Sequence, residues 1–399
     1  MAFDPILIIS EWMRGIMLSW NFSEGLTDLI LKLIGAAVIG GFVLGMFIVQ
    51  TWLERKVAAR IQDRIGPNRV GWRGIFQPIA DAVKMVTKED TTPAKADKLI
   101  YNIAPVLSLG SVILVWGVIP FSATTFGANL NVGILYVAAV GSFGILSVLI
   151  AGWSSNNKFA LLGAFRGVAQ LISYEVPLLL TMIIPVFLAR SMNLSTIVEA
   201  QGEFNWFIFY APMAFVIFFI SNMAEIGRAP FDLLEAESEI VAGYNVEYSG
   251  MKFGLFMASE FAHSFAAGAM ISVLFFGGWQ PFSSPWVGLM VFFAKAFFFY
   301  FVIMWIRLTV PRIRIDHMMS LNWKFMVPLA LVLLMTTPLL EYFVKDLGWI
   351  RMASHAALNI GMFVIAFFVI ANKAIKKKPG KVRFPERPLA VPPKEESAV

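Results

Sequence analysis

Charged side chains stand inside long apolar stretches of this sequence. Glu175, Glu260 and Lys295 do so, and His263 lies one helical turn from Glu260. A charge at the centre of a membrane helix costs about 2.5–3.5 kcal/mol, so such groups are candidates for function. At roughly 1.5 Å per residue, Glu175 lies about 14 Å and Glu260 about 12 Å from the nearer loop. With Glu225 at the end of a further apolar stretch, they predict a ladder that exchanges protons; the alternative is a packing ion pair between Lys295 and one of the glutamates.

The segment 225–251 is strongly acidic. Against the single basic residue Arg228 it holds Glu225, Asp232, Glu235, Glu237, Glu239 and Glu247. If residues 231–242 are helical, Asp232, Glu235 and Glu239 share one face, and carboxylates so placed favour proton uptake because like charges repel. A solvated acidic surface is the alternative. A metal site is a weaker one, because the spacing does not match a calcium-binding loop and offers no histidine, and we expect none.

A basic segment follows the first apolar stretch. Over 54–65 an apolar residue recurs every four positions, at Val57, Ile61 and Ile65, with basic side chains beside this stripe. The pattern predicts an amphipathic helix at the membrane surface that ends at Gly66-Pro67. Such a helix either anchors to lipid headgroups or lines an opening for an amphiphilic ligand, and periodicity does not separate the two.

The composition requires a membrane around these elements. The 399 residues are 58% hydrophobic and 15% charged, with a mean hydropathy of +0.73, whereas a soluble domain averages roughly 45–50% apolar and about 25% charged residues. This excludes a soluble globular enzyme, a disordered chain and a nucleic-acid-binding module. The chain has no cysteine, which excludes disulfides and iron–sulfur ligation by its own residues.

Nine apolar segments are long enough to cross a bilayer core of roughly 30 Å. They are 28–52, 101–120, 134–153, 166–189, 207–224, 252–276, 288–306, 326–343 and 356–372. Alternate loops hold 26 of the 32 Lys and Arg residues, so the positive-inside rule places the N-terminus outside and the C-terminus inside. The sequence therefore predicts an all-α, polytopic bundle of about nine transmembrane helices with interfacial amphipathic helices.

The same patterns divide the chain into four parts. An N-terminal interfacial segment, 1–27, precedes a transmembrane core, 28–345, and an additional helix, 346–372, leads to a basic tail, 373–399. The core has inner loops at 53–100, 225–251 and 307–325, and the arginines of the last loop suit either anionic lipid or an acidic partner. Gly41-x-x-x-Gly45 and Gly163-x-x-x-Gly167 predict close helix packing. Pro177 can open its helix two residues beyond Glu175.

Several motifs in these loops are specific. They are Glu54-Arg55-Lys56 through Arg69-Val70-Gly71, Gln77-Pro78-Ile79-Ala80-Asp81, Ser173-Tyr174-Glu175, Ala224-Glu225-x-x-Arg228-x-Pro230-Phe231-Asp232, Glu235-Ala236-Glu237-Ser238-Glu239, Asn245-Val246-Glu247-Tyr248, Trp305-Ile306-Arg307 and Pro311-Arg312-x-Arg314. Over about 28–345 the chain resembles the H subunit family of respiratory complex I. The resemblance implies the membrane subunit of a proton-pumping NADH:quinone oxidoreductase, which docks the redox arm, forms much of the quinone chamber and is not catalytic alone.

The resemblance also implies ligands and partners. Quinone would be the substrate, while FMN and iron–sulfur clusters would belong to partner subunits. The peripheral redox arm would dock on the cytoplasmic side, and small membrane subunits and antiporter-like subunits would lie laterally, among lipids of a bacterial inner membrane or an equivalent energy-transducing membrane. Nucleic acid is not an expected partner. The alternatives are the related membrane anchor of an ion-translocating hydrogenase and an ion-coupled secondary transporter, although the sequence lacks the internal repeats usual in the latter.

Specific residues follow from this resemblance together with the ladder. The predicted quinone-binding residues are Arg55, Arg64, Asp81, Asp232, Glu235, Glu237, Arg307 and Arg312. The predicted proton path comprises Glu175, Glu225, Glu239, Glu260 and Lys295. Quinone reduction would draw protons from the acidic loop, and the resulting charge would act on the buried carboxylates in turn, with 225–251 as the moving element.

Overall fold

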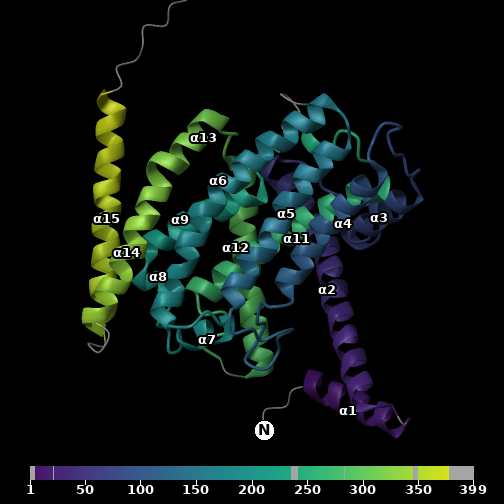
Figure 1. The fold of residues 1–399 in the computed structure, drawn as a ribbon, viewed down its shortest axis with the longest axis horizontal. Coiled ribbons are helices and arrows are strands. Elements are labelled where there is room, and N and C mark those ends of the chain that lie inside the picture. Colours follow the sequence, from purple (N-terminus) through teal and green to yellow (C-terminus); the bar gives the residue numbers. More distant parts are fainter. Residues whose placement is uncertain (1–4, 21, 235–240, 283, 345–348, 377–399) are drawn as a thin grey trace, which may run out of the picture.

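The fold is known from a computed structural model that describes residues 5–20, 22–234, 241–282, 284–344 and 349–376. These residues form helices joined by loops, with no strand among them (Figure 1), which confirms the predicted all-α bundle. The helices are α1 (Pro5–Ser19), α2 (Glu24–Ile61), α3 (Gln77–Thr87), α4 (Lys98–Trp116), α5 (Gly133–Ser154), α6 (Lys158–Ala189), α7 (Leu194–Glu199), α8 (Phe207–Tyr210), α9 (Pro212–Ile226), α11 (Gly250–Phe275), α12 (Pro285–Thr309), α13 (Ile315–Leu321), α14 (Val327–Val344) and α15 (Trp349–Lys376).

Eight described helical stretches are long and apolar enough to cross a membrane. They are α2, α4, α5, α6, α11, α12, the continuous stretch Ile315–Val344 and α15. The predicted span 207–224 differs, because α8 ends at Tyr210 and α9, which begins at Pro212, has only 15 residues. Pro212 has no N–H to continue the preceding helix and restricts Ala211 to non-helical geometry. At about 1.5 Å per residue α9 is roughly 22 Å long, shorter than a bilayer core.

The first span is longer than predicted. Helix α2 continues for 38 residues to Ile61, so the predicted surface helix over 54–65 is not a separate element and ends well before Gly66-Pro67. The reason is local: residues 46–61 contain neither glycine nor proline, and nothing interrupts the backbone hydrogen bonds. The helix ends where Asp63 turns to a positive φ of 50°.

Small residues set the closest approaches in the bundle. A Cβ on Gly268 would lie 2.7 Å from the carbonyl oxygen of Ala296, so α11 and α12 touch there. A Cβ on Gly163 would lie 2.6 Å from the Cα atom of Gly243. Gly163 therefore allows close packing of α6 against a loop rather than against another span. A Cβ on Gly41 or Gly45 would meet no described atom within 4 Å. The close helix packing predicted for this pair is therefore not present among the described residues.

The bundle has two distinct ends (Figure 1). Helices α1 and α7 lie at one, here called the α7 end, and α3 and α13 lie at the other, the α3 end. Helix α15 runs along the edge of the bundle beside α14, and its C-terminal turns reach the α3 end. The N-terminal helix and the C-terminal end of α15 therefore lie at opposite ends of the bundle.

Candidate functional site

Four charged side chains meet near the α3 end. Arg228, 2% exposed, donates from Nη1 to Glu54 and from Nε to Glu260, at 2.8 Å in both cases. Arg307 on α12 binds the other carboxylate oxygen of Glu54, and Tyr300 donates to Glu54 at 3.4 Å. Two carboxylates and two guanidinium ions thus balance one another, which a largely buried ion cluster needs to avoid a large desolvation cost. We call these four charged residues the Glu54 network.

A tight turn places Arg228 in this network. Gly227 ends α9 in the left-handed region, with φ of 74°, and a Cβ there would lie 2.3 Å from the Leu234 side chain. This is the usual glycine stop of a helix. Across the turn, Gln170 of α6 donates to the carbonyl oxygens of Ala224 and Phe231, both at 2.7 Å. The turn therefore points the arginine into the bundle rather than into solvent.

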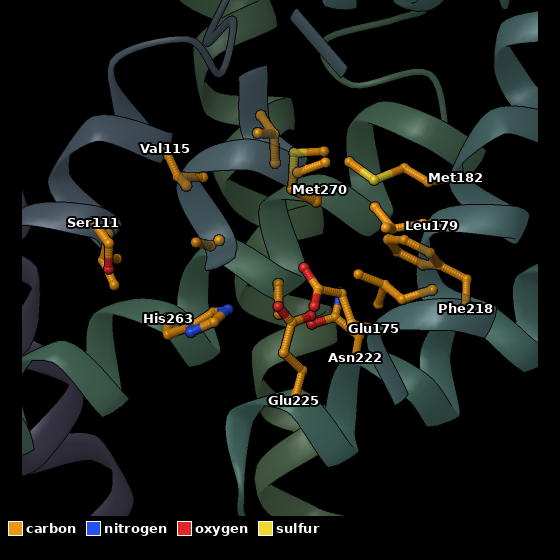
Figure 2. A pocket seen from close by; sticks show the side chains of 17 residues that line it. Ser111, Val115, Glu175, Leu179, Met182, Phe218, Asn222, Glu225, His263 and Met270 are labelled. Atoms are coloured by element: carbon orange, nitrogen blue, oxygen red, sulfur yellow. The ribbon is translucent and has the colours of Figure 1, made fainter. Parts of the chain in front are cut away.

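Two neighbouring cavities lead from the network into the bundle. The first, of about 70 Å³, is lined by Glu260, Glu225 and His263 with several serines. The second, of about 60 Å³, is lined by Glu225, His263 and Glu175 (Figure 2). A water molecule needs about 10–15 Å³ of such volume, so each cavity has room for several. Because Glu225 and His263 line both cavities, the three predicted carboxylates Glu260, Glu225 and Glu175 border two adjoining cavities, which together we call the carboxylate route.

The far end of this route is built around Glu175. Figure 2 shows the Glu175 and Glu225 carboxylates pointing toward each other beside Asn222. Ser142 on α5 donates to Glu175 at 2.7 Å. Gly141 leaves space for Glu225, since a Cβ there would lie 3.6 Å from its Oε1 atom. The contacts hold the two carboxylates near one another from three helices, α5, α6 and α9.

A proline shapes the helix at this point. Pro177 has no N–H for the carbonyl oxygen of Ser173, four residues earlier, and a helix loses one bond there. In place of that bond, the Asn322 amide donates to Ser173 at 2.5 Å. Tyr174 donates to the carbonyl oxygen of Met318 at 3.0 Å. The turn of α6 that bears Glu175 is therefore tied to α13 and the π-helical turn Asn322–Met326.

A wide cleft opens at the α3 end. Its volume is about 780 Å³, and its lining includes Arg55, Arg64, Arg69, Gln77 and residues 65–68. The predicted residues Arg55 and Arg64 thus share one cleft, and Asp81 lies behind Arg55 with an N–O distance of 2.5 Å. Burial acts to raise the pKa of Asp81, but hydrogen bonds from Arg55 and Gln77 and the charges of Arg55 and Lys84 together hold it below its usual value.

Two loops join beside the network. Arg312 binds Asp232 at 2.8 Å, and the backbone N–H of Ile313 donates to the carbonyl oxygen of Pro230 at 3.0 Å. The predicted site residues Glu235, Glu237 and Glu239 lie outside the described residues. Residues 231–234 and 241–242 are not helical. Asp232 therefore does not lie on a helix, and the shared helical face predicted for Asp232, Glu235 and Glu239 does not include it.

Lys295 lies elsewhere. Its ammonium group donates to the carbonyl oxygens of Phe276, Gly278 and Gln280, at 2.6–3.0 Å, and stands over the Trp206 ring. These carbonyls follow the C-terminus of α11, where a cation is favoured by the helix dipole. Phe276 is about 24 Å from Glu260 along the helix at 1.5 Å per residue. The structure therefore brings Lys295 neither into the carboxylate route nor into an ion pair with Glu175 or Glu260.

Two residues of the network were not predicted as site residues, Glu54 and Arg228. Glu54 lies at the end of the first apolar stretch, and Arg228 is the one arginine in an acidic segment. Either position could have marked the residue as a candidate for the site. Among the described residues, no group of three or more histidine, aspartate or glutamate side chains could hold a metal ion.

Known proteins are similar to this chain along most of its length. A family model described as NADH dehydrogenase matches residues 34–338. The NADH-quinone oxidoreductase H subunit of Dehalococcoides mccartyi (strain CBDB1) is 45% identical over 306 residues, which cover 76% of this chain and 85% of that protein. The H subunit numbered 1 of Geobacter metallireducens is 46% identical over 335 residues, 82% and 98% of the two chains. The H subunit of Anaeromyxobacter dehalogenans is 40% identical over 389 residues, 90% and 91% of the two chains.

Proposed function

Since the chain belongs to the family of NADH-quinone oxidoreductase H subunits, we propose that it forms much of the quinone chamber and couples quinone reduction to proton translocation. It is a membrane subunit of an oxidoreductase complex. The observation that carries the proposal is that the Glu54 network leads through Glu260 and two adjoining cavities to Glu175, while the arginine-lined cleft begins at Arg55, the next residue after Glu54.

The cleft suits the quinone headgroup. Its carbonyl oxygens accept hydrogen bonds, and the guanidinium groups of Arg55 and Arg64 are donors that keep their charge at every relevant pH. Asp81 orients Arg55, and the pair Asp232–Arg312 stands at the loop junction on the same end of the bundle. As the resemblance to the family implies, Glu235 and Glu237 would contribute to quinone binding and Glu239 to the proton path.

Glu260 links the two halves of the mechanism. It is bound to Arg228 and also lines the first cavity. When quinone reduction draws protons from the chamber, the charge near Arg307 and Glu54 changes, and interactions between charges are strong in this low-dielectric setting. Arg228 then moves toward Glu54 and releases Glu260, which takes up a proton. That proton passes by way of Glu225 to Glu175, while Lys295 has no part in the path.

The orientation in the membrane follows from the charge distribution, and the partners follow from the family to which the chain belongs. The α3 end, with the basic loops, faces the cytoplasm and binds the redox arm, whose subunits hold FMN and the iron–sulfur clusters. The N-terminus lies outside and the C-terminus inside. Small membrane subunits and antiporter-like subunits lie laterally, the latter receiving the signal from the Glu175 side, in the lipid of a bacterial inner membrane. The chain carries out no redox chemistry without these partners.

The test is Glu175→Gln in native membranes, with quinone reduction and proton pumping measured together and assembly checked on a native gel. We expect an assembled complex whose proton pumping falls at least tenfold. Glu199→Gln, an exposed carboxylate at the α7 end, is the matched control and should pump normally. Full pumping by the Glu175 variant, with normal quinone turnover, would remove this residue from the path.

A further inference from the structure

A groove on the outer face of the bundle lies apart from the quinone cleft. It runs between the last turns of α2 and α12 and has a volume of about 510 Å³. Its floor is formed by Val57 and Ile61 of α2 and by Phe301 and Trp305 of α12. The two aromatic rings are 5.9 Å apart, and their side chains are 40% and 55% exposed.

Two cations border this apolar floor. Lys56 and Arg60 lie one turn apart on α2 and line the groove. In the described part of the chain, no carboxylate lies within ion-pairing distance of either. The neighbouring arginines differ, since Arg55 is bound to Asp81 and Arg307 to Glu54. The groove thus combines an apolar surface with two charges that no carboxylate of the described residues balances.

The depth of the groove suits a lipid. Tryptophan side chains gather at the interface between acyl chains and headgroups, and Trp305 lies four residues before the end of α12 at Thr309. Lys56 and Arg60 follow the apolar part of α2, which runs from residue 28 to 53. The apolar floor is therefore level with the first part of the acyl chains, and long basic side chains extend from such positions toward the headgroups.

We propose that this groove binds one anionic phospholipid of the inner leaflet, with its phosphate held by Lys56 and Arg60 and an acyl chain along Val57, Ile61, Phe301 and Trp305. A quinone has no charge to balance two cations, and the predicted quinone contacts Arg55 and Arg64 belong to the separate cleft. The lipid would hold the last turns of α2, from which Glu54 enters the network. This site is additional to the proposed function and does not depend on it.

The test uses the purified, detergent-washed complex and native mass spectrometry with added phosphatidylglycerol or phosphatidylcholine. Each basic residue near an anionic headgroup contributes about 1 kcal/mol, so Lys56→Gln with Arg60→Gln should weaken phosphatidylglycerol binding on the order of 30-fold. Lys158→Gln with Lys324→Gln removes two exposed cations elsewhere and is the matched control. Phe301→Ala with Trp305→Ala should weaken both lipids alike.

Two results would overturn the site. One is phosphatidylcholine binding as tightly as phosphatidylglycerol, or equal binding by the Lys56/Arg60 variant and its control. The other comes from a benzoylphenylalanine photocrosslinker at position 305 in the assembled complex. Capture of a phospholipid supports the proposal, whereas capture of a partner subunit shows that protein covers the groove. Failure of the Glu175 test leaves these lipid measurements unaffected, so the two proposals are separable.

Discussion

Arg228 lies between Glu54 and Glu260 and is 2.8 Å from each. One nitrogen serves the carboxylate that α2 contributes near the cleft, and another serves the carboxylate that lines the first cavity. The third guanidinium nitrogen, Nη2, is buried and has no hydrogen-bond partner among the described residues. A cation shared in this way responds to a change in either carboxylate, and in the proposed mechanism this relationship joins the quinone chamber to the proton path.

Replacing Arg228 by methionine should have the largest effect of any change in the network. It leaves two carboxylates close together in a buried place, and breaking a buried ion cluster in this way costs about 3–5 kcal/mol. We expect poor assembly on a native gel. The double variant Arg228→Met with Glu260→Gln removes one of the stranded charges and should recover part of the assembled complex. No difference between the single variant and wild type would contradict the buried network.

Asp81 should make the complex sensitive to acid. Its pKa in the fold lies below the unfolded value, so its contribution to stability is complete above the unfolded pKa and is lost as the pH falls through the folded pKa. The difference in thermal midpoint between wild type and Asp81→Asn should therefore be largest at neutral pH and shrink in acid. Since Arg55 is half exposed, the difference should be modest and reduced by salt. A difference that grows in acid would contradict the assignment.

Asn322 and Pro177 should show coupled effects. Asn322→Ala leaves the Ser173 carbonyl without a donor, which costs about 1–3 kcal/mol when the group is buried. Pro177→Ala returns an N–H at the position that bonds Ser173 in a regular helix. Asn322→Ala should therefore cost less in the Pro177→Ala background. A double-mutant cycle of thermal midpoints, read with proton pumping, measures this coupling, and strictly additive effects would show that the asparagine is not a substitute for the missing helical bond.

The additional helix α15 should depend on Glu341. This buried carboxylate accepts from Arg351 at 2.9 Å and Arg190 at 3.4 Å and contacts His355 at 3.2 Å, beyond the matched residues 34–338. Glu341→Ala leaves Arg351 and Arg190 without this carboxylate, so hydrogen exchange over 349–366 should rise while that of α4 is unchanged. Thr336→Ala, a partly exposed position on α14, is the control. Unchanged exchange in the Glu341 variant would mean that apolar packing alone holds α15.

Hydropathy and charge predicted the position and order of most spans because both properties belong to each segment alone. Hydropathy could not predict the helix break at Ala211. There Pro212 ends the preceding helix although the surrounding residues are all apolar. The pairing of Arg55 with Asp81 joins residues 26 positions apart, and no local pattern reports it. The sequence singled out Glu260 and Glu225 because a charge in an apolar helix is conspicuous, and the structure places both at one cavity.

Lys295 shows the limit of that signal. It is conspicuous for the same reason, yet the turn after α11 folds its carbonyls around the ammonium group, and only the folded chain contains that arrangement. Arg228 is the converse case. Its sequence position is a loop, and its burial depends on the left-handed turn at Gly227 and on the amide of Gln170.

In the proposed mechanism, carboxylates on this chain take up protons when quinone is reduced. Redox-induced infrared difference spectroscopy of the assembled complex measures this directly, through the absorption band of a protonated carboxyl group. We predict a band that appears on reduction, is lost in Glu260→Gln and remains in the exposed control Glu199→Gln. An identical difference spectrum in wild type and Glu260→Gln would rule out proton uptake at this carboxylate.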